Sequence, residues 1–91
     1  MFKVEKIFEE DSTVFRLVGH VKAEHVADLK TLIADERAPV QLDLSEVTLV
    51  DLDVVCFLKD YERRGVQLIN CSPYVREWIR REKTANSLLK E

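Results

Sequence analysis

The spacing of apolar and polar residues predicts two neighbouring strands at the start of the chain. Residues 2–8 alternate loosely between apolar and polar side chains, and residues 13–18 are rich in β-branched and aromatic ones. Four polar residues, 9–12, separate the two segments, and Gly19 is expected to close the second strand. Two strands joined by such a short polar turn predict an antiparallel hairpin.

Apolar residues at helical spacing predict three helices further along the chain. The first covers residues from about 22 to 37, although Lys22 stands where a capping Ser, Thr or Asp is expected. The second begins at Asp51 or Asp53 as N-cap and ends at Gly65. The third begins at Ser72, which is followed by a proline, the residue best tolerated in a first helical turn.

Two further strands lie between these helices. Residues 40–44 alternate with period two and lead into a predicted loop, 45–50, while residues 66–71 form a buried strand. The order is therefore β-β-α-β-α-β-α, and the strand-helix-strand connections predict right-handed parallel crossovers. We expect one α/β domain over residues 1–91, with helices packed on a mixed sheet that an antiparallel hairpin opens.

The aromatic residues supply much of the expected core. A small domain depends on large side chains for buried area, so five of them are predicted to lie between the sheet and the helices. They are Phe2, Phe8, Phe15, Phe57 and Trp78. Tyr61 and Tyr74 are expected to keep their hydroxyls in water.

The composition of the chain excludes several classes of function. The chain has 91 residues and a net charge of -3, and no apolar run approaches the roughly 20 residues of a membrane span. We therefore expect a small cytoplasmic protein with no direct membrane insertion, and the acidic balance argues against a nucleic-acid partner. Cys56 and Cys71 lack the spacing of a redox or zinc motif, and Gly19 and Gly65 are too isolated to cradle a phosphate. No catalysis, cofactor or metal is expected.

Three segments carry a resemblance to a known family. Residues 40–51, reading VQLDLSEVTLVD, resemble the central signature of STAS domains, the sulfate transporter and anti-sigma factor antagonist family. Residues 19–21 resemble the family's turn before its first helix, and residues 71–76 the start of its third helix. The resemblance extends over about residues 2–82. It implies a non-catalytic protein-protein interaction module of bacterial signalling.

The chain departs from this family where the phosphorylatable members carry Ser-Ser-Gly. Asp51 matches the aspartate of the motif, and Leu52, Asp53 and Val54 follow it, so that Asp53 occupies the position of the phosphoacceptor serine. The two acids are either helix-terminal residues and nothing more, or Asp53 supplies a permanent negative charge where relatives add phosphate. The second interpretation predicts a module that phosphorylation at the usual serine does not switch.

The resemblance places a partner-binding surface around the first turn of the second helix. The predicted contact residues are Gly19, His20, Lys22, Ser45, Thr48, Asp51, Leu52, Asp53 and Val54. Ser45 and Thr48 either satisfy backbone groups or offer a displaced phosphosite. Leu52 is either an exposed apolar contact or packs back on the domain as a hydrophobic staple.

Two kinds of partner remain open. One is an anti-sigma factor kinase in a partner-switching system, and the other is a larger assembly, such as a stressosome or a lipid or anion transport complex, in which the chain is an accessory or scaffold subunit. Residues 43–62 carry six acids and one base, whereas residues 63–83 carry six bases and two acids. This separation either steers a partner or favours a homo-oligomer, or it belongs to ordinary solvated helix faces, with Arg80 or Lys83 paired to Glu77.

Overall fold

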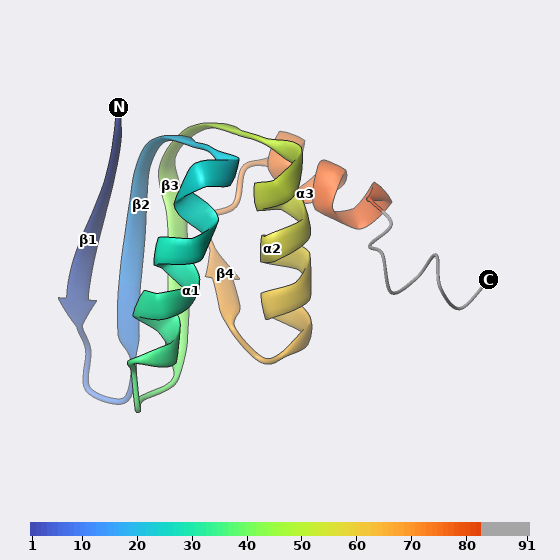
Figure 1. Cartoon of the computed structure of the whole chain (residues 1–91). Helices are drawn as coiled ribbons and strands as arrows, with labels where there is room; N and C mark the ends of the chain where they lie inside the picture. Colours follow the sequence, from blue (N-terminus) through green and yellow to red (C-terminus); the bar gives the residue numbers. More distant parts are fainter. Residues whose placement is uncertain (83–91) are drawn as a thin grey trace.

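The computed structural model describes residues 1–82, which form a four-stranded sheet and three α-helices (Figure 1). The strands are β1 (Phe2–Phe8), β2 (Thr13–Val21), β3 (Val40–Val50) and β4 (Gln67–Ile69). The helices are α1 (Val26–Ala34), which the 3-10 turn η1 (Ala23–His25) precedes, α2 (Leu52–Arg63) and α3 (Pro73–Arg81). The predicted order of elements is confirmed.

The sheet is mixed, as predicted. Its strands lie in the order β1-β2-β3-β4, with β1 antiparallel to β2 and the other two pairings parallel. The hairpin pairs Phe8 with Thr13 at its turn and Phe2 with Gly19 at its open end. Helices α1 and α2 cover one face of the sheet (Figure 1).

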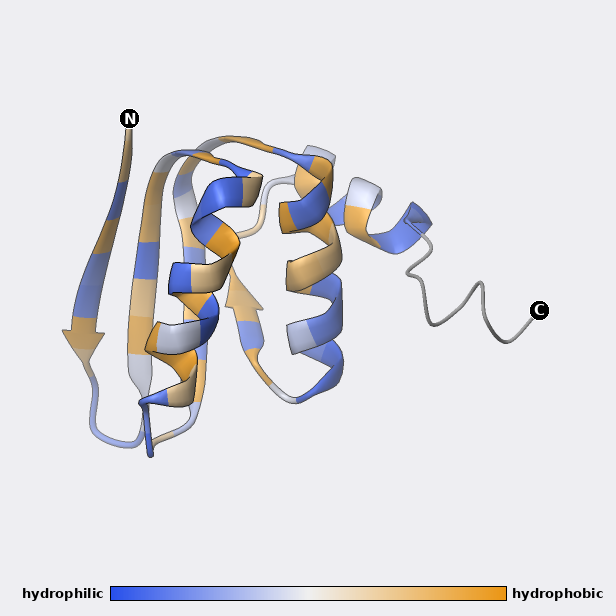
Figure 2. Ribbon diagram, viewed as in Figure 1, coloured by the Kyte–Doolittle hydropathy of each residue, from blue (hydrophilic) through white to orange (hydrophobic). Residues whose placement is uncertain are grey.

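The core lies between the sheet and these two helices. Figure 2 shows apolar residues along β2 and β3 and on the helices that face them. Six side chains of β2, β3 and α2 are completely buried, because both layers direct apolar residues at one another. They are Leu17, Val21, Leu42, Val54, Val55 and Leu58.

Strand β3 is longer than predicted, because residues 45–50 continue it instead of forming a loop. Two register shifts against β2, between Arg16 and Val18 and between Gly19 and His20, each leave an extra residue in β3. Leu44, Val47 and Val50 therefore contact the core at intervals of three residues. Because its apolar residues do not alternate with polar ones, this half of the strand was predicted as a loop.

Strand β2 also runs further than predicted, since Gly19 lies inside it and not at its end. The first helix is correspondingly shorter than the predicted 22–37: it starts with η1 and α1 ends at Ala34. Glu36 is instead drawn to the hairpin, where its carboxylate accepts a hydrogen bond from Thr13 Oγ1 at 2.7 Å and pairs with Lys6 Nζ at 2.6 Å.

The ends of α2 and α3 match the sequence signals. Gly65 follows α2 with a φ of 108°, a left-handed conformation that favours glycine. Ser72 precedes α3, and its Oγ accepts a hydrogen bond from the Val75 N–H at 3.2 Å, while Pro73 occupies the first helical position. Both predicted boundaries are confirmed.

Four of the five aromatic residues predicted for the core contribute to it. Phe15 and Phe57 are buried, and Phe2 and Trp78 are partly buried against the same cluster. The prediction was wrong for Phe8, which is 75% exposed. Phe8 is the last residue of the edge strand β1, and opposite it lie the polar residues that follow α1 instead of an apolar helix face.

Much of the basic charge in the C-terminal third is neutralised locally. Arg76 pairs with Glu62 at 2.9 Å, and Arg80 and Arg81 both pair with Glu77 at 2.7 Å. Of the two predicted partners of Glu77, Arg80 is thus confirmed, and Lys83 lies outside the described residues. These contacts fit the interpretation of this segment as a solvated helix face.

The two glycines differ in what surrounds them, and this generates a stability prediction. A Cβ on Gly19 (φ 96°) would overlap the carbonyl oxygen of Met1, whereas a Cβ on Gly65 would meet nothing within 4 Å. We expect Gly65→Ala to cost about 1–2 kcal/mol through backbone strain alone. Gly19→Ala should cost more and separate the first residues of β1 from β2. Urea unfolding of both variants measures the difference, and equal losses would contradict the steric role of Gly19.

Candidate functional site

Asp51 lies where three segments of the predicted surface meet. Its backbone follows β3, and its N–H donates to the Val21 carbonyl at 3.2 Å, which ties the end of β3 to the end of β2. Its Oδ1 accepts a hydrogen bond from His20 Nε2 at 2.9 Å, and its Oδ2 accepts one from the Ala23 N–H at 3.2 Å. The side chain therefore joins the end of β2 and the start of η1 to the start of α2.

These contacts explain why the first helix can begin without a Ser, Thr or Asp at its N-cap position. Of the two acids predicted as N-cap of α2, Asp51 occupies that position, but its carboxylate makes no capping bond to α2. It satisfies the N–H of Ala23 at the start of η1, 28 residues earlier in the chain. The Lys22 N–H donates to His25 Nδ1 at 2.9 Å, so the N–H groups of Lys22 and Ala23 both have side-chain acceptors.

The neighbours of Asp51 also set its charge. The hydrogen bond from His20, followed by the bond from the Ala23 N–H, lowers the pKa of Asp51 below its ordinary value. Asp51 is thus a stable carboxylate whose two oxygens are both engaged. Its arrangement supports a structural role and leaves the neighbouring acid, Asp53, as the carboxylate available at this helix start.

The three residues after Asp51 have different environments. Leu52 is 49% exposed, and Asp53 is exposed in the first turn of α2. Val54 is completely buried in the core, so it supports α2 from inside and does not contribute to the surface predicted for it. A partner that approaches this helix start would therefore contact Leu52 and Asp53.

The other predicted contact residues divide between two places. Gly19 and His20 lie in the last third of β2, beside the second half of β3, where Gly19 pairs with Val47, and Lys22 follows the strand. Thr48 is exposed on that half of β3. Ser45 is exposed too, but its N–H donates to Asp43 Oδ1 at 2.9 Å, so it belongs to a separate polar network.

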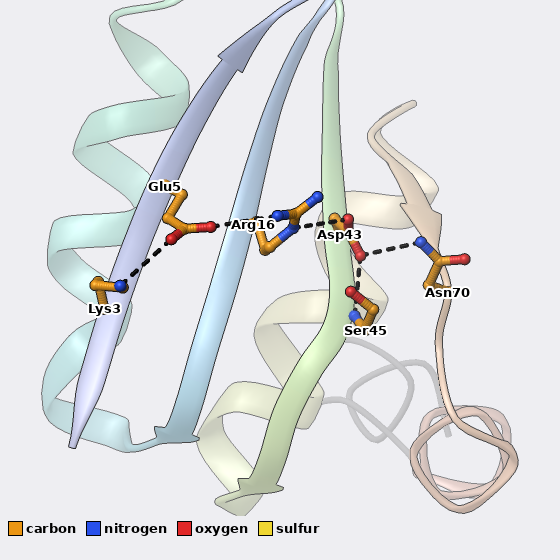
Figure 3. A network of polar contacts seen from close by, with 6 residues as sticks. All are labelled: Lys3, Glu5, Arg16, Asp43, Ser45 and Asn70. Atoms are coloured by element: carbon orange, nitrogen blue, oxygen red, sulfur yellow. Dashed lines mark hydrogen bonds and ion pairs between the residues drawn. The ribbon is translucent and has the colours of Figure 1, made fainter.

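This network crosses the sheet from β1 to the end of β4 (Figure 3). Glu5 lies between Lys3 and Arg16, at 3.3 and 3.4 Å, and Arg16 Nε donates to Asp43 Oδ2 at 3.2 Å. Asn70, which has a left-handed φ of 57°, donates to Asp43 Oδ1 at 3.1 Å. All four strands are connected through this row of side chains.

Asp43 is the buried member of the network, with only 5% of its surface exposed. Burial raises the pKa of its carboxyl group, but the hydrogen bonds from the Ser45 backbone, Asn70, the Ser45 side chain and Arg16 outweigh burial and lower the pKa to about 2. Ser45 therefore has a structural partner in Asp43, which its backbone N–H contacts.

One exposed apolar residue beside the predicted surface was not predicted from the sequence. Leu49 precedes Asp51 by two positions in β3 and is 52% exposed, a fraction similar to that of Leu52. A signal for it existed: residues 47, 49 and 50 are all apolar, and one face of a single strand cannot bury all three. Together with Leu52 and Asp53, Leu49 defines what we call the α2-start surface.

The comparisons with known proteins concern structure alone, since no protein-family model and no curated protein matches the sequence. The anti-sigma factor antagonist SpoIIAA in its unphosphorylated form matches 99% of this chain over 96% of its own, with a TM-score of 0.63 and 19% identity. An antisigma-factor antagonist STAS domain from Rhodobacter sphaeroides matches 76% of this chain over 86% of its own, with a TM-score of 0.59 and 22% identity.

A third solved structure is the Bacillus cell fate determinant SpoIIAA in its phosphorylated form. It matches 99% of this chain over 97% of its own, with a TM-score of 0.52 and 16% identity. The chain therefore has the α/β fold of STAS anti-sigma factor antagonist domains, as the motifs in the sequence predicted. Within the described residues, no helix has both the length and the apolar character to span a membrane.

The network around Asp43 generates a pH prediction. Its pKa is about 2 in the folded chain against an ordinary 3.8, so Asp43 stabilises the fold above about pH 4, and this stabilisation is lost as the pH falls towards 2. We expect Asp43→Asn to lower the free energy of unfolding at neutral pH by about 2 kcal/mol and to flatten its dependence on pH between about 4 and 2. Urea unfolding across this range measures both effects. Asp35→Asn, which removes an exposed carboxylate, is the control, and an equal flattening in that variant would contradict the prediction.

Proposed function

We propose that the chain is a non-catalytic protein-protein interaction module that acts as an anti-sigma factor antagonist through the α2-start surface. The observation that carries the proposal is the contrast between neighbouring side chains there. Asp51 is engaged by His20 and Ala23, whereas Leu52 and Asp53 project from the first turn of α2 with exposed surface. The likeness of the fold to antagonists of this class supports the same conclusion.

Asp53 gives this surface its particular character. It lies in the first helical turn, where unpaired backbone N–H groups favour a negative charge. A carboxylate carries one charge, whereas a phosphoserine carries about -1.5 to -2 and has more acceptor oxygens. Asp53 therefore carries a permanent negative charge that is smaller than the charge of a phosphoserine. The module keeps one binding state, and control of the complex belongs to the partner.

The partner that fits is an anti-sigma factor, because the solved structures with this fold are named as antagonists of such factors. Its contact surface should combine an apolar patch for Leu49 and Leu52 with a cation for Asp53. Apolar contacts supply the area that stabilises a complex, and a charge at their edge guides its formation.

The thiols support a non-catalytic role. Burial raises the pKa of Cys56 and that of Cys71, so both remain protonated near neutral pH. A protonated thiol is a poor nucleophile, because the thiolate is the reactive form. The two cysteines fit better as small partly buried side chains than as reactive groups.

Substitution of Leu52 tests the location of the surface. We expect Leu52→Glu to weaken binding of the partner by at least about tenfold, because it places a second charge in an apolar contact. The partner is first identified by co-purification from the native host and then titrated against the purified variants by calorimetry.

Leu32→Glu is the matched control, because Leu32 is an exposed leucine of α1 with 37% of its surface accessible. It should bind the partner as the unmodified chain does. Equal losses in the two variants, or full binding by Leu52→Glu, would show that the partner binds elsewhere.

Substitution of Asp53 tests whether phosphorylation switches the module. The partner is incubated with ATP and the unmodified chain, Asp53→Ser or Asp53→Asn, and intact mass is measured. We expect phosphate on the Asp53→Ser variant, which restores a hydroxyl at the helix start, and none on the other two chains. Phosphate on Ser45 or Thr48 of the unmodified chain would contradict the proposal and identify a displaced phosphosite.

A further inference from the structure

An open hollow lies at the hairpin end of the molecule, away from the α2-start surface. It is lined by residues 6, 8–13 and 35–38, which come from the β1-β2 turn and from the segment after α1. Thr13 and His20 lie at opposite ends of β2, so this hollow and the contacts of Asp51 occupy opposite ends of the same strand. The function proposed above makes no use of it.

Hydrogen bonds hold the two walls of the hollow together. The Thr13 N–H donates to the Pro39 carbonyl at 2.9 Å, and Thr13 Oγ1 donates to Glu36 at 2.7 Å. Lys6 pairs with the same Glu36 carboxylate, and Glu9 N–H closes the hairpin turn by donating to the Ser12 carbonyl at 2.9 Å. The hollow is therefore formed before any ligand arrives, which lowers the entropic cost of binding.

Phe8 provides an apolar contact at the edge of this hollow. Its side chain is 75% exposed, the highest fraction among the large apolar residues of positions 2–82. The ammonium group of Lys6 lies 4.9 Å from the centroid of its ring, so the ring already accepts a cation on one side. An exposed aromatic ring beside a formed hollow is typical of an interaction surface.

The charged residues around the Phe8 ring indicate which kind of ligand this hollow binds. The lining contains five acidic residues and two basic ones. Lys6 is paired with Glu36, and in residues 1–82 the structure gives no ion pair to Glu9, Glu10, Asp11 or Asp35. Unneutralised carboxylates attract cations and repel nucleic acid, so the complementary ligand is positively charged and has an apolar side chain for Phe8.

We propose that this hollow, with Phe8 at its edge, binds a basic amphipathic segment of a partner protein. Lysine or arginine side chains of the segment pair with the carboxylates of residues 9–11 and 35, and an apolar side chain packs on the Phe8 ring. The module then has two binding surfaces at opposite ends of β2, one for the regulated partner and one that attaches the module to a basic protein.

A peptide titration tests this proposal. The probe is a synthetic amphipathic peptide of lysine and leucine, and its analogue with glutamate in place of lysine is the first control. NMR spectra of the ¹⁵N-labelled chain should show shifts concentrated in residues 6–13 and 35–38 with the basic peptide and none with the acidic one. Phe8→Ser should weaken binding by about tenfold.

A pair of charge-matched variants separates a defined surface from general attraction to an acidic protein. Glu10→Gln/Asp11→Asn removes two acids at the hollow, and Glu24→Gln/Asp28→Asn removes two exposed acids around the start of α1. The first variant should lose affinity several-fold, and the second should retain it. Equal losses in both variants, full binding by Phe8→Ser, or shifts spread over the whole surface would overturn the proposal. The function of the α2-start surface would stand in each of those cases.

Discussion

The Asp51 carboxylate determines how the end of the domain that carries the α2-start surface is assembled. One oxygen binds His20 at the end of β2, and the other accepts the Ala23 N–H at the start of the first helix. The backbone of Asp51 at the same time begins α2 and bonds to Val21. A single residue therefore fixes the relative positions of β2, α1, β3 and α2, and the exposed side chains of this region inherit their geometry from it.

The contacts of Asp51 distinguish it from Asp53, although the sequence alone gives the two acids the same possible roles. Either Asp51 or Asp53 would serve as a helix-terminal residue by composition alone. The structure engages both oxygens of Asp51 in tertiary hydrogen bonds, and it leaves Asp53 exposed in the first turn of the helix. A structural role thus accounts for Asp51. Asp53 is exposed, and this is why we propose a functional role for Asp53 alone.

Local signals predicted most of the fold, because most elements carry their own boundaries. The hairpin, Gly65 after α2 and Ser72 before α3 are all encoded within a few residues of where they act. The cap of the first helix could not be found in this way, since Asp51 lies 28 residues from the N–H it accepts. A pattern along the chain does not record a contact between distant segments.

Strand β3 shows the same limit in its hydrophobic pattern. Its register shifts against β2 make core contacts recur every three residues from Leu44 to Val50, so the regular alternation of a strand is lost. The irregular half of the strand is also the part that carries Thr48 and Leu49 to the surface. Local departures from ideal strand geometry tend to occur where a protein exposes residues for binding, and the candidate site was consequently harder to predict than the fold that supports it.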